Sequence, residues 1–228
     1  MTIFEFALKR SFGNPTNLIF LSLFPLAAIF LPQSELWPAL PYGYHYFGIL
    51  LLFVAIRLTA ILIEDRTSGI VKRLAVAPIT HFSYLSQNLL AFACILVLQC
   101  TVVVAGGVLY GQELGQPLML LVLYVSFAFT ALAMAVAWVA LYRSKEIAFL
   151  VYMTIIVLLS LLGGMLFPVE MIPEPLSRVI MVLPTYWLTD GMAWVTSGGD
   201  LLDFWLANGV LWLYTIIFLT LGSVRKIH

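Results

Sequence analysis

Few residues in this sequence have the types and spacing that catalysis requires. The chain has no G-x-x-x-x-G-K-[ST] loop for phosphate, no H-E-x-x-H or paired Cys/His spacing for a metal, and no G-x-S-x-G nucleophile motif. Its three histidines, His45, His81 and His228, lie far apart and are expected to be boundary residues rather than ligands. Cys94 and Cys100 are separated by about 9 Å of rise on one expected helix, too far for a disulfide. We therefore expect no catalytic, cofactor or metal site.

One charged residue interrupts an otherwise apolar stretch. Arg57 lies within 44–63, where an arginine at mid-membrane depth costs about 2.5–3.5 kcal/mol on insertion scales. It is about 10 Å of helical rise from Glu64, so its side chain could snorkel toward the nearer boundary or pair with a neighbouring helix. Alternatively, the charge faces a transport path through the membrane. Both interpretations are compatible with the sequence.

The composition indicates what kind of element must hold these residues. Of 228 residues, 63% are hydrophobic and 10% are charged, with 11 Lys and Arg against 11 Asp and Glu. Soluble domains have about 45–50% and about 25%, respectively. These values exclude a soluble globular domain, a disordered chain and a nucleic-acid-binding protein. Because the apolar residues form long uncharged runs, the sequence predicts an all-α integral membrane protein.

We predict six transmembrane helices in a single membrane domain covering residues 1–228. A span needs about 20 helical residues to cross a hydrocarbon core of about 30 Å. The expected spans are about 16–34, 44–63, 85–111, 117–142, 147–167 and 204–224. The first is the weakest because it is short and contains Pro25, which is tolerated if a neighbouring helix satisfies the carbonyl that the proline leaves free.

Two flanking segments are predicted to be helical without crossing the membrane. Residues 2–13 place apolar side chains on one half of a helical wheel, which favours an amphipathic interfacial helix over an ordinary basic flank. Residues 168–195 contain four prolines together with charged residues, which argues against a further span. We expect short re-entrant helices there, in the outer leaflet between spans five and six.

The distribution of basic residues predicts the orientation. With six spans, nine of the eleven fall on one side: Lys9, Arg10, Arg66, Lys72, Arg73, Arg143, Lys145, Arg225 and Lys226. The other side has Arg178 alone. Because short cytoplasmic loops are enriched in Lys and Arg, both termini are expected to be cytoplasmic.

The loop after the second span has the most informative local pattern. Gly69 permits a sharp reversal after Glu64, and residues 70–77 can form two helical turns that end at Pro78. Such a helix would have one apolar and one basic side, formed by Ile70, Val71 and Leu74 and by Lys72 and Arg73. It could bind in a groove of a cytoplasmic partner. The alternative is a solvated loop without a partner.

Three motifs in this order resemble a known family. The first is the loop, where Glu64, Gly69, Leu74 and Pro78 match. The second is Gly163-Gly164-Met165-Leu166-Phe167-Pro168, followed by Ile172-Pro173. The third is Leu183-Pro184-Thr185-Tyr186 and the residues to Gly191. Together with six spans they resemble the permeases of type-2 ABC transporters, the type V exporters. Ile70 and Leu183 depart from the family's usual Thr and Asn.

The resemblance implies an inner-membrane exporter permease that hydrolyses nothing itself. It would dimerise with a second copy or a paralogue and would contact membrane lipid. ATP and Mg²⁺ would bind to separate ATP-binding cassette subunits. Coupling to those subunits would use Glu64, Gly69, Ile70, Val71, Lys72, Arg73, Leu74 and Pro78. The translocation path would include Arg57, Thr154 and Ser160, and an outer gate would include Gly163, Gly164, Phe167, Pro168 and Pro173.

The apolar spans favour an amphipathic or lipidic substrate, such as a drug, a peptide or a lipid-linked molecule. Two other classes of function are compatible with parts of the pattern. One is a non-transporting membrane scaffold that anchors a cytoplasmic partner. The other is an ion-coupled carrier or channel, which the lack of carboxylates within the spans disfavours.

Overall fold

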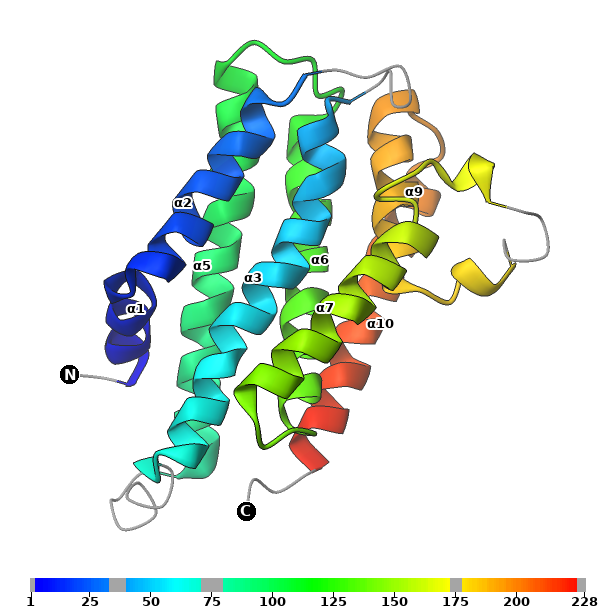
Figure 1. Cartoon of the computed structure of the whole chain (residues 1–228). Helices are drawn as coiled ribbons and strands as arrows, with labels where there is room; N and C mark the ends of the chain where they lie inside the picture. The colour runs from blue at the N-terminus through cyan, green and yellow to red at the C-terminus, as the bar shows by residue number, and fades with distance from the viewer. Residues whose placement is uncertain (1–2, 33–39, 71–79, 173–177, 225–228) are drawn as a thin grey trace.

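The computed structural model describes residues 3–32, 40–70, 80–172 and 178–224, and within them the chain is a bundle of helices without strands (Figure 1). In chain order these are α1 (Ile3–Gly13), α2 (Pro15–Phe30), α3 (Tyr42–Thr67), α5 (His81–Leu109), α6 (Pro117–Val139), α7 (Lys145–Leu162), the 3₁₀ turn η1 (Val169–Met171), α9 (Pro184–Ser197) and α10 (Leu201–Val224). The all-α prediction is confirmed.

Five of these helices are long and apolar enough to cross a membrane by themselves: α3, α5, α6, α7 and α10. The sixth predicted span corresponds to α2, which has 16 residues, or about 24 Å of rise. It reaches the length of a membrane span only if it is taken together with α1, and the two helices are bent by 73° relative to each other. The described chain therefore has five or six candidate spans. Helix α2, which corresponds to the weakest predicted span, is also the one that is too short to count as a span by itself.

Helices α3 and α6 form the centre of the bundle. In the most apolar window of each helix, 72% of the residues are buried, compared with 22% in α7 and 28% in α10. Helix α6 packs against both α3 and α10, and α2 packs against α3 and α5. The outward faces of α7 and α10 therefore remain apolar and exposed, as expected for surfaces that contact lipid or another protein.

Polar contacts and close backbone approaches hold the helices together. Thr130 on α6 donates to the Leu211 carbonyl on α10 at 2.8 Å, and Ser126 donates to Asn208 at 2.8 Å. Gly43 lets α3 approach α2 so closely that a Cβ there would lie 1.6 Å from the Ala28 carbonyl oxygen. Hydrogen bonds and small residues are the common means of packing helices where hydrophobic burial gives little driving force.

The helix bounds differ from the predicted spans where local sequence signals end a helix. The predicted 147–167 span is helical only to Leu162, because the chain turns at Gly163 and at Gly164, which has φ +83°. At its other end α7 begins two residues earlier, after Ser144, whose side chain accepts a hydrogen bond from the Ile147 N–H. Helix α3 continues to Thr67, four residues beyond its predicted range.

Figure 1 shows that the described parts of α1, the end of α3, the start of α5 and the α6–α7 turn lie at one end of the bundle. The α5–α6 turn and the α9–α10 turn lie at the opposite end. This arrangement brings the described parts of the predicted cytoplasmic segments to one end. Most of the predicted coupling helix, residues 71–77, and Pro173 of the predicted outer gate lie outside the described residues.

Candidate functional site

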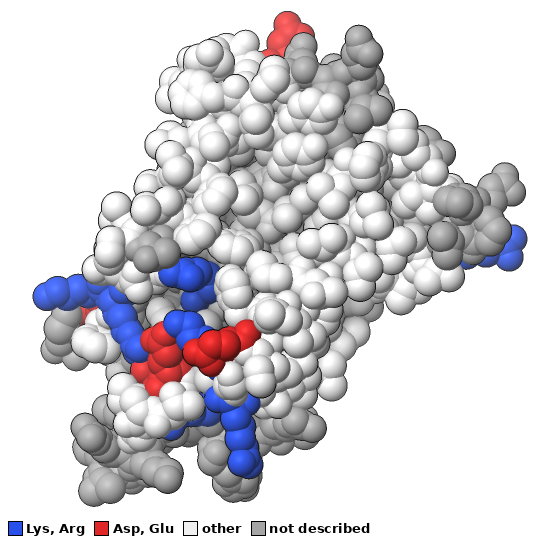
Figure 2. Space-filling model, in the orientation of Figure 1, with Lys and Arg blue, Asp and Glu red and all other residues white. Residues whose placement is uncertain are grey.

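An ion-pair cluster links three helices at the end of the bundle where α1 lies. Glu64, in the last turn of α3, accepts a hydrogen bond from Arg10 Nη2 on α1 at 2.9 Å and another from Lys145 on α7. Figure 2 shows blue and red side chains gathered toward this end. Glu64 was expected from the sequence to begin the coupling loop. The structure adds that its carboxylate joins α3 to α1 and α7.

Asp65, which the sequence analysis did not single out, is the buried member of the cluster. Its side chain is 6% exposed, whereas that of Glu64 is 39% exposed. It accepts hydrogen bonds from Arg10 Nη1 and from the Tyr84 hydroxyl of α5, each at 2.5 Å. Asp65 follows Ile61 by four residues on the buried face of α3. A carboxylate on that face requires partners, and this signal could have been found in the sequence.

Arg10 is the cation shared by the two carboxylates. Burial disfavours its charge, but the hydrogen bonds and charges of Asp65 and Glu64 outweigh that effect and raise the pKa of Arg10 above its usual value. The guanidinium therefore stays charged at every physiological pH. Its two terminal nitrogens, Nη1 and Nη2, bind Asp65 and Glu64, respectively, and these contacts hold α1 against the end of α3.

Arg57 contacts α2 rather than the acidic pair. Its Nε donates to Asn17 Oδ1 at 2.9 Å, and its guanidinium carbon lies 5.2 Å from the centre of the Phe20 ring. Among the residues that the structure describes, no carboxylate forms an ion pair with it. The side chain is partly buried in a small polar cavity that Glu64 and Lys145 also line.

The structure does not place the other two predicted path residues on one surface. Thr154 is exposed on the outward face of α7, and its hydroxyl donates to the Leu150 carbonyl of its own helix at 3.4 Å. Ser160 is fully buried, and its hydroxyl has no hydrogen-bond partner within the described chain. The two residues therefore lie on different faces of α7, one exposed and one buried.

The predicted outer-gate residues that the structure describes, Gly163, Gly164, Phe167 and Pro168, lie at or next to a tight junction between α7 and α9. Thr185 donates to the Leu159 carbonyl at 2.8 Å, and Thr189 donates to the Gly163 carbonyl at 2.7 Å. A Cβ on Gly163 would lie 2.0 Å from the Thr185 hydroxyl oxygen, and Gly164 has φ +83°. Phe167 is exposed beyond this junction, and Pro168 precedes the η1 turn. The glycine pair is thus required by both packing and backbone conformation.

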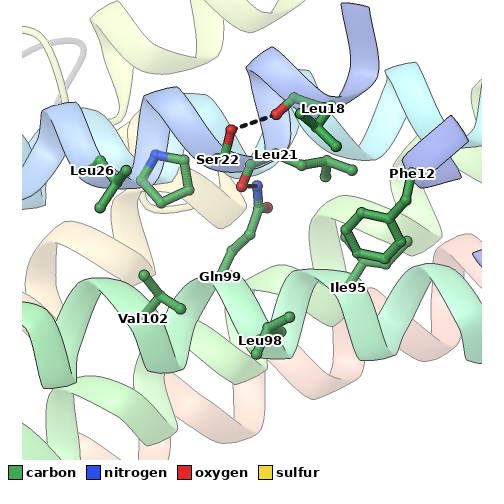
Figure 3. A pocket seen from close by; sticks show the side chains of 10 residues that line it. Phe12, Leu18, Leu21, Ser22, Leu26, Ile95, Leu98, Gln99 and Val102 are labelled. Carbon is green, nitrogen blue, oxygen red and sulfur yellow. Dashed lines mark hydrogen bonds between the residues drawn. The ribbon is translucent and has the colours of Figure 1, made fainter. Parts of the chain in front are cut away.

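An apolar pocket of about 280 Å³ lies between α2 and α5. Figure 3 shows the Gln99 amide extending from α5 to α2, where its Nε2 donates to the Leu21 carbonyl at 3.1 Å. Leu21 is four residues before Pro25, so this carbonyl has lost its normal helical donor. A side chain from a neighbouring helix satisfies it, as the presence of a proline in a membrane helix requires.

The start of the predicted coupling loop is described, but its helix is not. Helix α3 ends at Thr67, and Gly69 has φ +73°, which confirms the need for glycine at the reversal. Ile70 is partly buried at the end of the described segment. Val71, Lys72, Arg73, Leu74 and Pro78 lie outside the described residues.

Comparisons with known proteins give a consistent result. The family profile described as ABC-2 family transporter protein matches residues 40–224, from the start of α3 to the end of α10. A Bacillus subtilis (strain 168) protein named "Putative transport permease YvfS" is 23% identical over 235 residues, which cover 95% of this chain and 92% of that protein. The matched range includes the acidic pair, Arg57 and the α7–α9 junction.

Proposed function

The chain belongs to the ABC-2 family of transporter proteins, and on that premise we propose that it is the transmembrane permease subunit of an ATP-driven exporter. It is a multi-pass membrane protein, and the similarity to a relative named as a transport permease agrees with this role. In this proposal it dimerises with a second copy or a paralogue in the inner membrane, with both termini cytoplasmic. Separate ATP-binding cassette subunits bind ATP and Mg²⁺.

The observation that carries the coupling step is the position of Glu64. This residue lies in the last turn of α3, next to the loop that we propose is cytoplasmic, and it contacts α1 through Arg10 and α7 through Lys145. The sequence has no phosphate-binding loop, so energy must enter through a protein contact. A force applied to residues 70–78 by an ATPase subunit would move the end of α3, and the ion pairs would carry that movement to α1 and α7.

The exposed faces of the bundle support dimerisation and an amphipathic or lipidic substrate. Helix α7 presents Leu150, Thr154, Val157 and Leu161 outward, on one face of the helix. A contiguous apolar helix face in a membrane permease can bind lipid or pack against a second permease. In the dimer, we propose that this face and Arg57 on α3 adjoin the translocation path, while the α7–α9 junction forms the outer gate.

The test is a pull-down of the ATP-binding subunit with wild-type permease and with Leu74→Asp. The substitution removes an apolar anchor and introduces an unpaired carboxylate, and losing such an anchor commonly costs about 2 kcal/mol or more. We expect at least a tenfold loss of bound ATPase subunit and loss of transport in reconstituted vesicles. Leu141→Asp is the matched control, because Leu141 is exposed in the α6–α7 turn at the same end of the bundle.

Three outcomes separate the functional classes. Loss of ATPase binding with Leu74→Asp alone supports the coupled exporter. Unchanged binding and transport would show that residues 70–77 are a solvated loop. A wild-type chain that binds a cytoplasmic partner without ATP-dependent transport would instead support a membrane scaffold.

A further inference from the structure

We propose that the polar cavity beside Arg57 binds the phosphate headgroup of a membrane amphiphile, whose apolar chain lies along an adjacent group of phenylalanines. The cavity has a volume of about 80 Å³ and is formed by the α1–α2 corner, α3 and α7. Its polar lining consists of Arg10, Asn14, Asn17, Arg57, Glu64 and Lys145.

The charge of the cavity favours an anion. Its lining contains three cations and one carboxylate. Asp65, which does not line the cavity, also pairs with Arg10. When both carboxylates are counted, one positive charge remains in excess. Glu64 is occupied by Arg10 and Lys145. Of the three cations that line the cavity, Arg57 is the one that forms no ion pair with a described residue, and its contacts, Asn17 and Phe20, are both uncharged. An unpaired arginine in a membrane helix is costly, so a functional partner is expected.

The geometry of Arg57 leaves its best donors available. Its Nε is used by Asn17, whereas neither terminal guanidinium nitrogen donates to an acceptor in the described chain. Two parallel N–H groups of this kind match the oxygens of a phosphate. A volume of about 80 Å³ accommodates one compact anion but is well below the roughly 300 Å³ or more of a pocket for a whole drug-sized molecule. Only the headgroup would therefore enter.

An aromatic surface continues from the cavity along the same helices. Phe20 stacks on Phe24 with ring centres 4.9 Å apart and contacts Phe53 at 4.8 Å, and Phe53 contacts Phe149 of α7 at 5.7 Å. All four rings are partly exposed. Phe53 lies one helical turn from Arg57 on α3, so the polar and aromatic surfaces are contiguous. This combination fits a molecule that has an anionic head and an apolar chain.

Binding can be measured on the purified permease without an ATPase subunit, by native mass spectrometry in detergent. The ligands used are dioctanoyl phosphatidic acid, dioctanoylglycerol, which has the same chains without phosphate, and inorganic phosphate. We expect phosphatidic acid to bind and Arg57→Gln to weaken its binding at least tenfold, since charge-assisted hydrogen bonds are lost. Arg57→Lys should retain part of the affinity because it keeps the charge but not the planar fork.

Arg143→Gln is the matched control, because Arg143 is exposed at the same end but does not line the cavity. Size-exclusion profiles and thermal unfolding should show that Arg57→Gln remains folded. Equal losses in the two glutamine variants, or equal binding of dioctanoylglycerol, would overturn the proposal. Binding of inorganic phosphate as tight as that of phosphatidic acid would show a simple anion site and would overturn the role of the aromatic surface. This inference does not depend on the pull-down result, because the binding assay contains no ATPase.

Discussion

Glu64 and Asp65 are neighbours in sequence but differ in burial, so the same kind of substitution should have different effects on stability. In Asp65→Asn, a neutral amide replaces the buried carboxylate that accepts hydrogen bonds from Arg10 and from the Tyr84 hydroxyl. We expect the free energy of unfolding to fall by about 2 kcal/mol or more. Glu64→Gln removes the ion pairs of a carboxylate that is 39% exposed, and solvent screening should keep that loss below about 1 kcal/mol. Thermal unfolding in detergent measures both.

Glu64→Gln should nevertheless impair coupling, because Lys145 of α7 loses its ionic partner. The expected result is a fall in ATP-dependent transport with nearly unchanged unfolding temperature. Similar destabilisation by both variants would contradict the difference in burial that we assign to the two carboxylates.

The role of Gln99 depends on Leu21, a residue 78 positions away in the sequence. Gln99→Leu should destabilise the chain by about 1 kcal/mol, because the Leu21 carbonyl loses the donor that replaces the missing Pro25 N–H. Pro25→Ala restores a helical donor to that carbonyl. In the Pro25→Ala background, Gln99→Leu should therefore cost less, and a double-mutant cycle measures the difference. Equal effects of Gln99→Leu in both backgrounds would show that the amide does not serve this carbonyl.

At the junction between α7 and α9, the backbone conformation and the neighbouring side chains limit which residues can occupy position 164. Gly164→Ala must place a side chain at φ +83°, with its Cβ 2.4 Å from Val169 Cγ2, and we expect a loss of about 1–2 kcal/mol. Gly209 of α10 is the control, since a Cβ there meets nothing within 4 Å. Gly209→Ala should be neutral or stabilise the helix by up to about 1 kcal/mol.

Unfolding measurements on the two alanine variants test this requirement directly. If Gly164→Ala is as well tolerated as Gly209→Ala, the backbone at the junction is not constrained by its left-handed conformation. If the folded Gly164→Ala fraction loses transport while basal ATPase activity is retained, that result supports an outer gate at this junction.

At the scale of the whole molecule, the arrangement of the turns predicts the topology. The α5–α6 turn with Glu113 and the α9–α10 turn with Asp200 lie at one end, and the α6–α7 turn with Arg143 lies at the other (Figure 1). All three residues are exposed. In a background with Cys94 and Cys100 replaced, an impermeant thiol reagent applied to sealed cells should label cysteines at 113 and 200 but not at 143. Labelling at 143 from outside would contradict the proposed orientation.

The sequence by itself determined that this chain is helical and resides in a membrane. Hydropathy over about 20 residues and the composition of short loops are local properties, so they can be read without knowing which helices touch. The reversal at Gly69 follows from backbone chemistry in the same way. The predicted 147–167 span, in contrast, ran through the Gly163–Gly164 pair, where the structure ends α7. The resemblance of three ordered motifs to ABC-2 permeases was likewise present in the sequence, and the family match over residues 40–224 confirmed it.

Only the tertiary structure decided which polar groups meet. Arg10 and Asp65 are separated by 55 positions, and Arg57 and Asn17 by 40, so no local pattern pairs them. The resemblance to ABC-2 permeases implied that Thr154 and Ser160 both belong to the translocation path, whereas the structure exposes the first and buries the second. The physical reason is that the rotation of each helix is set by packing against its neighbours, through contacts such as those between α3 and α7 and between α7 and α9. Hydropathy fixes where a helix crosses the membrane, but packing fixes which of its faces can bind a partner, a lipid or a substrate.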